Sequence, residues 1–247
     1  ARDSLAVNNP RPSKGGAKQE PLETVRQKAL GTFAAQNRAV TKEDYILRCY
    51  TMPPKFGNVA KAYIIQDEQV DSTNPEAKIP NPLAMNIYCM GYNAGKQIVP
   101  LNPAIKQNLK TYISQFRLMT DAINIKDAFI VNYGVNFEVI PKPNYNGSEV
   151  IVRCVARIKE LLHVDNMHIN APIVISDIYS NLDQVEGVQT VSDVLVHNMY
   201  DTNSGYSGNV YDMKAATLNN IIYPSLDPCI FEIRFPNADI KGRIVGI

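Results

Sequence analysis

The stretch DAFIVNYGVNFEVI, residues 127–140, decides much of the architecture that the sequence predicts. Its second half alternates apolar with polar side chains over Val135, Asn136, Phe137, Glu138 and Val139. Such alternation is typical of a strand with one buried and one exposed face. Gly134 interrupts the run, so we expect a kink or a bulge there. The segment therefore predicts one long strand.

Helical patterns flank this strand on both sides. After a turn over residues 141–147, Ser148 is the expected N-cap of a helix. Its apolar face consists of Ile151, Val155, Ile158 and Leu162. Before the strand, Asn102-Pro103 should begin a helix with an apolar stripe at Ile105, Leu109, Tyr112, Ile113 and Phe116. Both spacings predict amphipathic helices packed against a sheet.

Further elements lie at either end of the chain. A helix is expected over residues 21–36, and Thr41 with Asp44 forms a variant capping box for the next helix. Ser176 should cap a later helix, after a short strand. Near the C-terminus, the alternation around Phe231 to Phe235, a turn and a strand from Ile240 predict a C-terminal β-hairpin.

The predicted fold class is α+β, with mixed or antiparallel sheets, packed helices and helix-to-strand units. Four parts are expected along the chain. They are an N-terminal helical and strand segment at 1–66, a loop or extended hairpin tip at 67–83, an α+β core domain at 84–197, and a C-terminal β-rich interaction segment at 198–247.

Composition narrows the classes of function. The 247 residues are 45% hydrophobic and carry a formal net charge of +1, which is unlike a disordered or collagen-like chain. We therefore expect neither nucleic acid nor membrane as a partner. Four cysteines, widely spaced at Cys49, Cys89, Cys154 and Cys229, predict no metal site, no redox pair and a reducing place of synthesis.

No arrangement typical of catalysis stands out. His163 and His168 are five residues apart, whereas helical metal ligands are spaced by three or four, and His163 should lie in a last helical turn. There is no Gly-x-Ser-x-Gly elbow and no carboxylate pair to single out. We therefore expect no catalytic, cofactor or metal-binding residue, and hence no enzyme.

Residues 198–212 are rich in Tyr, Asn, Ser and Gly, a composition that suits either recognition or a merely exposed loop. Taken as recognition, this composition and the strand that follows predict interface residues. They are Tyr200, Tyr206, Tyr211, Phe231 and Phe235.

One run of sequence resembles a known family. AAQNRAVTKEDY at 34–45, followed by FGNVAKA at 56–62, is similar to the baseplate J-like family of contractile phage tails, and more closely to the baseplate wedge subunits of T4-type phages. The lead-in LAVNNP at 5–10 and the C-terminal run IIYPSLDP at 221–228 also resemble those subunits. The resembling pieces span the whole chain in the expected order.

The resemblance implies a structural role. It suggests a wedge subunit that forms homodimers, binds other wedge subunits and closes an inner baseplate ring around the hub. Such a protein would be assembled in the host cytoplasm and reside in the virion tail. Larger family members carry a long N-terminal helical part. Because the chain begins at Ala1 without it, the resemblance suggests a C-terminal fragment.

Two other classes remain open from the residues. Exposed tyrosines could serve a tail module that binds a glycan or small ligand, although the chain has no Trp. A carboxylate-based hydrolase of the cell envelope would need two acids converging in a cleft, one with a raised pKa.

Overall fold

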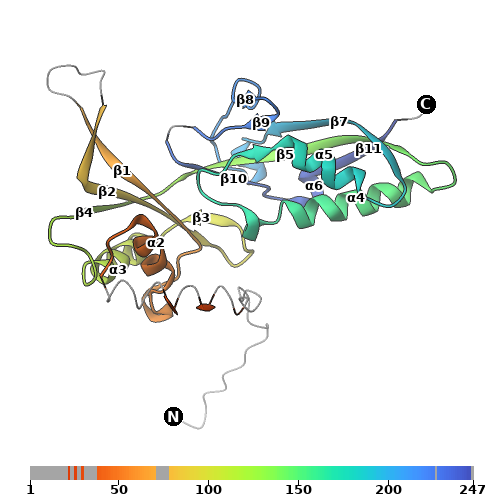
Figure 1. Cartoon of the computed structure of the whole chain (residues 1–247). Coiled ribbons are helices and arrows are strands. Elements are labelled where there is room, and N and C mark those ends of the chain that lie inside the picture. Colours follow the sequence, from red (N-terminus) through yellow and green to blue (C-terminus); the bar gives the residue numbers. More distant parts are fainter. Residues whose placement is uncertain are drawn as a thin grey trace, which may run out of the picture.

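The computed structural model describes residues 22, 25–26, 29–30, 38–70, 78–225 and 227–245. These residues form two lobes that follow one another along a long axis, each built around its own sheet (Figure 1). The first sheet uses residues 61–126 and the second uses residues 129–244. The boundary between the lobes thus falls near Asp127, inside the 84–197 segment that the sequence suggested as one domain.

In the N-terminal lobe a four-stranded sheet carries two helices. Strand β2 (Lys78–Tyr92) is its central strand, and β1 (Lys61–Val70) pairs antiparallel along one side of it. Strands β3 (Ile98–Pro100) and β4 (Ala122–Lys126) both pair with β2, antiparallel and parallel respectively. Helices α2 (Lys42–Tyr50) and α3 (Pro103–Ile113) pack against this sheet, with η1 (Pro54–Phe56) beside α3. Their shared core includes Tyr45, Ile87, Leu109 and Ile113.

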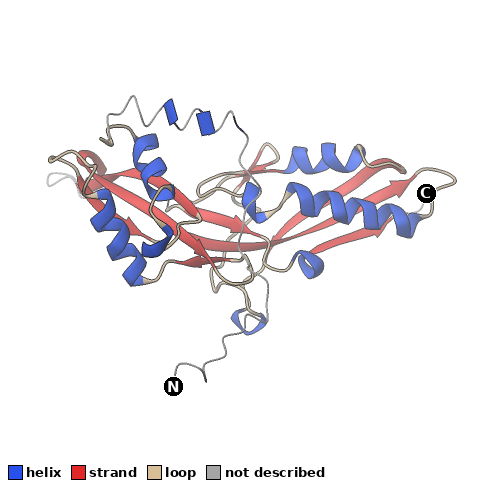
Figure 2. Cartoon of the chain, turned by 90° about the horizontal axis from the view of Figure 1, so that it is seen from below, coloured by secondary structure: helices blue, strands red, loops and turns tan. Residues whose placement is uncertain are grey.

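The C-terminal lobe is organised around β5 (Phe129–Pro141), the long strand that the alternation predicts. On one side β5 pairs antiparallel with β7 (Val188–Asn198). On the other side it pairs in parallel with β10 (Cys229–Glu232) and then β11 (Ile240–Ile244). Helices α4 (Gly147–Leu161) and α5 (Ile175–Asp183) lie next to each other against this sheet (Figure 2).

Smaller elements complete this lobe. A three-stranded sheet has the order β6 (Ile173–Val174), β9 (Ile221–Ile222), β8 (Thr217–Leu218). Short helices are η2 (Val164–Asn166), η3 (Thr202–Ser204) and α6 (Pro236–Asp239), which separates β10 from β11. Among the helices of the described part of the chain, none combines the length and apolar character that crossing a bilayer requires.

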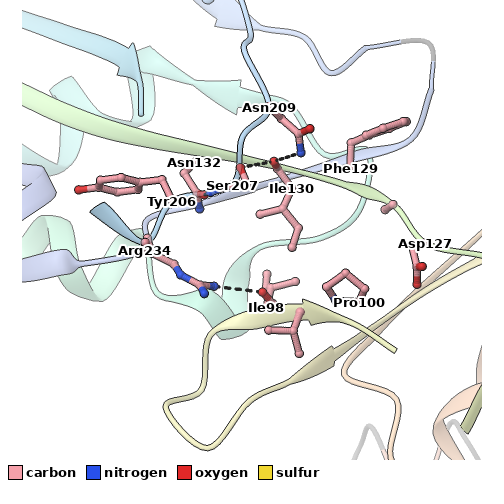
Figure 3. A pocket seen from close by; sticks show the side chains of 13 residues that line it. Ile98, Pro100, Asp127, Phe129, Ile130, Asn132, Tyr206, Ser207, Asn209 and Arg234 are labelled. Atoms are coloured by element: carbon pink, nitrogen blue, oxygen red, sulfur yellow. Dashed lines mark hydrogen bonds between the residues drawn. The ribbon is translucent and has the colours of Figure 1, made fainter. Parts of the chain in front are cut away.

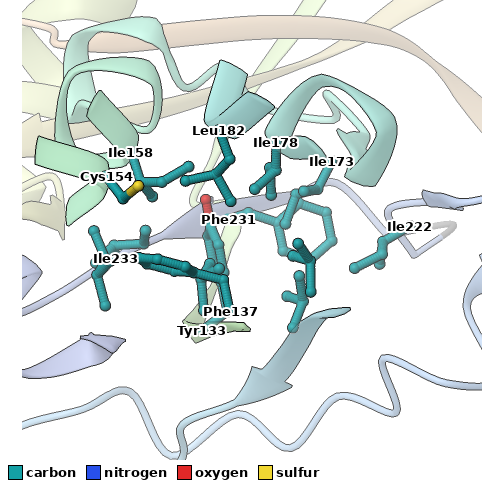
Figure 4. Packing of buried hydrophobic residues seen from close by; sticks show 14 of the residues in the cluster. Tyr133, Phe137, Cys154, Ile158, Ile173, Ile178, Leu182, Ile222, Phe231 and Ile233 are labelled. Carbon is teal, nitrogen blue, oxygen red and sulfur yellow. The ribbon is translucent and has the colours of Figure 1, made fainter. Parts of the chain in front are cut away.

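The core between the sheet and its two helices is densely apolar (Figure 4). Tyr133, Phe137 and Phe231 from the sheet face Cys154, Ile158 and Leu182 from the helices, and all six are at most 1% exposed. Complete burial of one such apolar side chain contributes about 1.5–3 kcal/mol relative to exposure. This core fixes α4 and α5 to one face of the sheet.

The α+β class with mixed and antiparallel sheets is confirmed, but the C-terminal hairpin is wrong. Strands β10 and β11 do not pair with each other; both run parallel to β5 along the same edge. Residues 236–239, expected as a hairpin turn, form α6, where Asp239 Oδ2 accepts a hydrogen bond from Phe235 N at 2.7 Å. Alternation predicts a strand but not the strand it pairs with.

The predicted helix starts are partly right. The Thr41 capping box is present: Thr41 Oγ1 accepts from Asp44 N at 3.2 Å, and Asp44 Oδ2 accepts from Thr41 N at 3.0 Å. In contrast, α4 is capped by Asn146, whose Oδ1 accepts from Ser148 N, so Ser148 is not the cap. Helix α5 begins at Ile175 without a side-chain cap, so Ser176 is not one either.

Other local expectations shift in position. The irregularities in β5 occur at Glu138/Val139 and Ile140/Pro141, not at Gly134. The polar segment 67–83 is an extended hairpin as far as it is described, because β1 and β2 reach Val70 and Lys78. In the expected helix 21–36, residues 22, 25–26 and 29–30 are helical, and the rest lies outside the described residues.

Candidate interaction surfaces

A buried carboxylate joins the two lobes. Glu232, at the end of β10, is 1% exposed. Its Oε1 accepts a hydrogen bond from Ile98 N of β3 at 2.6 Å, and its Oε2 accepts one from Asn132 Nδ2 at 3.0 Å. Arg234 Nη1 lies 3.3 Å from Oε2 and also donates to Ile98 O at 3.2 Å. Strand β3 is therefore held to the C-terminal lobe through charge-assisted hydrogen bonds.

A second contact between the lobes centres on Asp165 in η2. Lys61 Nζ donates to Asp165 O at 2.8 Å, and Tyr92 OH donates to Oδ1 at 3.4 Å. Lys96 Nζ lies 3.7 Å from Oδ2. Burial lowers the pKa of Lys61, and the Asp165 charge opposes that shift. The two junctions together tie the sheet of the first lobe to the second.

Between the Glu232 junction and the tyrosine-rich segment lies a cavity of about 390 Å³ (Figure 3). Strand β3, the start of β5 and residues 205–209 line it, with Arg234 at one end. Ser207 Oγ and Asn209 Nδ2 both donate to Ile130 O at 2.7 Å, which anchors this segment on β5. The polar side chains that line the cavity are thus mostly engaged in hydrogen bonds that stabilise the fold.

The acid that lines this cavity is already paired. Asp127 Oδ2 is 2.5 Å from Lys106 Nζ, although its Oδ1 is buried without a hydrogen-bond partner among the described residues. Glycoside hydrolysis generally uses two carboxyl groups flanking the scissile bond. The residues lining the cavity include one carboxylate, Asp127, so they do not provide that pair.

The five predicted interface residues lie in different surroundings. Tyr200 is 56% exposed and Phe235 is 37% exposed. Phe231 is buried, with its ring edge-on to Tyr211 at 5.7 Å between centroids. Tyr206 packs edge-on against Phe235 at 5.4 Å. Of these five residues, Tyr200 and Phe235 are the most exposed, while Phe231 belongs to the core.

The other two tyrosine hydroxyls are engaged within the chain. Tyr206 OH donates to Asp239 Oδ1 at 2.5 Å, and burial together with this carboxylate raises the pKa of Tyr206 to about 12. Tyr211 OH donates to Tyr223 O at 2.5 Å. These bonds tie the 198–212 segment to α6 and to Tyr223 just after β9, so it is built as a fixed surface.

The histidines are separated in the structure. His163 lies beyond the end of α4 and caps η2, accepting from Asp165 N at 3.3 Å, so the expected last-turn position is wrong. Burial lowers the pKa of His168 and of His197, with Lys61 and Lys241 respectively adding to the effect. In the described part of the chain, no three His, Cys, Asp or Glu side chains gather as a metal site.

The four cysteines are buried and free. The thiols of Cys49 in α2 and Cys89 in β2 are neighbours. Their hydrogen bond and, to a smaller extent, burial raise the pKa of Cys89. Their spacing of 40 residues carries no sign of this contact, because only the fold brings α2 and β2 into one core.

A further surface was not foreseen from the sequence. On the side of the second sheet away from α4 and α5, a hollow of about 350 Å³ lies over β7, β5 and β11. Its acidic lining residues, Glu138 and Asp193, are direct cross-strand neighbours on β5 and β7, and its basic lining residues, Lys241 and Arg243, both lie on β11. Arg243 pairs with Glu138. Knowing that β11 lies beside β5 is necessary to find this surface.

Comparisons with known proteins find similarity among solved structures only. No family model matches the chain, and no curated protein matches it. Among solved structures, the chain is similar to a chain of the six-fold symmetrised electron cryo-microscopy structure of the anti-feeding prophage baseplate, with 16% identity and a TM-score of 0.48. The similarity covers 76% of this chain and 40% of that chain. At this level it is too weak to establish a function.

Proposed function

We propose that this protein is a structural component of a contractile-tail baseplate, a wedge subunit that associates with itself and with neighbouring wedge subunits in a ring. It would reside in the virion tail after assembly in the host cytoplasm. Its work would be done by surfaces that bind other subunits.

The observation that carries this proposal is the segment 34–45, which resembles the baseplate J-like family. In its described part, Thr41 and Asp44 form the capping box that begins α2. Tyr45, in the same segment, is fully buried, and its hydroxyl donates to Asp121 Oδ2 at 2.6 Å. The resembling residues therefore include a helix start and a core anchor of the N-terminal lobe.

The rigid connection between the lobes is consistent with such a role. At the lobe junction Glu232 of β10 accepts a hydrogen bond from β3, and Asp165 of η2 accepts one from Lys61 of β1. A subunit that transmits displacement through a ring must hold its contact surfaces in a fixed relation. We propose Tyr200 and Phe235 as contact residues, because their side chains are open to solvent on the second lobe.

Sedimentation velocity of the purified chain, alone and with separately purified wedge subunits, tests the proposal. We expect concentration-dependent dimers and larger complexes on mixing. Tyr200→Ala with Phe235→Ser should weaken these associations about tenfold or more, as expected for aromatic anchors at an interface. The matched control is Tyr145→Ala, an exposed tyrosine at the far end of α4 that we do not place in the interface.

A chain that remains monomeric at every concentration and binds none of the wedge subunits would contradict the proposed function. Normal association by the Tyr200/Phe235 variant would remove only the proposed contact residues. Circular dichroism of each variant verifies that the fold is retained.

A further inference from the structure

The two long edges of the second sheet differ in how they are protected. Along β7, side chains of α5 occupy the outward backbone amides: Tyr179 OH accepts from Val194 N at 3.0 Å, and Asp183 Oδ1 accepts from Val191 N at 3.2 Å. Capping of this kind blocks the addition of another strand. The β7 edge is therefore closed over this part of its length.

The opposite edge is formed by β11, which pairs only with β5 among the described residues. Val245 N donates to Val139 O at 3.1 Å, so the amides of Lys241, Arg243 and Val245 point toward β5. Because successive amides along a strand point in opposite directions, those of Gly242 and Ile244 point outward. Among the described residues no side chain forms a hydrogen bond with either amide, so β11 is an open edge strand there.

The helix side of this edge is apolar. A Cβ on Gly242 would lie 3.2 Å from Ile151 Cγ2, which places Ile151 of α4 directly over β11. Val155 follows one turn later on the same flank of α4 and is partly buried. Ile244, at the end of β11, packs beside Gly147 at the start of α4 and is 37% exposed. A strand added beside β11 would find an apolar overhang on this side.

The opposite side of the edge is basic. Lys241 and Arg243 alternate with the core-facing residues and line the hollow on the open face of the sheet. The acidic partner of Arg243 is Glu138 on the inner neighbour β5. Among the described residues, no strand lies on the outer side of β11. Acidic side chains directly opposite the two cations would give favourable cross-strand pairs.

The same charges disfavour pairing of β11 with itself. In an antiparallel two-fold pair centred on Gly242, Lys241 of one copy would lie opposite Arg243 of the other. Like charges directly opposite each other destabilise a strand pair. The occupant of this edge should therefore be a different segment.

We propose that the β11 edge accepts an extended segment of a partner protein in which apolar and acidic residues alternate. The apolar side chains would pack under Ile151 and Val155 of α4 and beside Ile244, and the acidic ones would pair with Lys241 and Arg243. Main-chain hydrogen bonds to the amides of Gly242 and Ile244 would extend the sheet by one strand. The inference rests on the proposed function, because it identifies where a neighbouring subunit contributes a strand.

The test uses the full chain and a labelled eight-residue peptide that alternates valine and glutamate, with a valine–lysine peptide for comparison. Fluorescence anisotropy should show about tenfold tighter binding of the valine–glutamate peptide, since two cross-strand pairs are at stake. Hydrogen exchange of residues 240–245 should slow in the complex. Lys241→Glu with Arg243→Glu should reverse the preference between the peptides, whereas Lys110→Glu with Lys126→Glu, which changes net charge equally, should not.

A second variant addresses the backbone. Ile244→Pro removes one outward amide while leaving the two cations, and we expect it to weaken binding of the valine–glutamate peptide about tenfold. Any one of three results would overturn the inference. They are no binding of the peptide, an equal loss of its binding in Lys110→Glu with Lys126→Glu, and hydrogen exchange that slows at residues other than 240–245. A dimer of the chain alone with slowed exchange at residues 240–245 would also overturn it.

The outcome separates this inference from the proposed function. A chain that assembles with wedge subunits but ignores the peptide contradicts only the strand addition. A chain that binds the peptide but stays monomeric with every wedge subunit contradicts the ring role and leaves the open edge as a peptide-binding surface.

Discussion

Replacing Glu232 should weaken the connection between the two lobes more than replacing any exposed charged residue does. The carboxylate accepts bonds from Ile98 N and Asn132 Nδ2 and contacts Arg234, and all of these lose their acceptor in Glu232→Ala. Removing one partner of a buried ion pair costs about 3–5 kcal/mol. We therefore expect Glu232→Ala to lower the free energy of unfolding by about that amount.

Glu232→Gln keeps the side-chain shape but offers one oxygen where the carboxylate offers two. Its amide group would face a donor, either Ile98 N or Asn132 Nδ2. A hydrogen bond to a charged partner contributes about 1.5–3 kcal/mol, so we expect a loss in that range. Glu138→Gln is the control, because its partner Arg243 is 74% exposed and such a pair contributes about 1 kcal/mol or less.

Urea unfolding followed by circular dichroism measures these free energies, and hydrogen exchange localises them. In a chain of this size about 1 kcal/mol shifts the melting temperature by about 2–4 °C, so the Ala variant should melt about 6–20 °C lower. Exchange at residues 97–100 should accelerate selectively in both Glu232 variants. If Glu232→Ala costs no more than Glu138→Gln, the carboxylate does not hold the lobes together and our reading of the junction fails.

Three further outcomes are expected. Thr41→Ala should cost about 0.5–2 kcal/mol in urea unfolding, because Asp44 N loses its acceptor; an unchanged midpoint would refute the cap. Since burial lowers the pKa of His197, the unfolded chain binds a proton first as pH falls below about 6.5. The free energy of unfolding should therefore decline below that pH, and it should decline less in His197→Gln. Equal declines in the variant and the unsubstituted protein would contradict this expectation. Burial raises the pKa of Cys154 to about 11, so it and the other thiols should react with Ellman's reagent only on unfolding.

Local patterns in the sequence predict the individual elements well. The alternation at 135–139 predicts β5, and the Thr41/Asp44 spacing predicts the start of α2, because both depend on side chains a few residues apart. Asn146 and Ser148 illustrate the limit of such patterns. Either side chain can cap a helix, and only the path of the turn decides that Asn146 does so.

Pairing between distant segments was not predictable. The alternation at 231–235 and the candidate strand at 240–245 predicted the two arms of a hairpin, but β10 and β11 both lie parallel to β5 because α6 returns the chain to the same edge. The Glu232 junction depends on Ile98, which is 134 residues away. The open edge of β11 depends on the same topology, so neither surface could be found before the strands were placed.

Among the five predicted contact residues, the aromatic composition could not separate buried from exposed positions. Phe231 and Phe235 belong to one alternating run, yet the first packs against Tyr133 in the core and the second lies at the surface. The chain leaves the sheet after Glu232, so the alternation no longer reports which side faces the core.

The most direct test of a structural role in a tail is to locate the protein in the particle. Immunogold electron microscopy of contractile tails, purified from the organism that encodes this chain, would use antibodies raised against residues 38–245. We predict label at the baseplate end of intact tails. Absence of label from intact tails, or label along the sheath alone, would contradict the assignment to the baseplate.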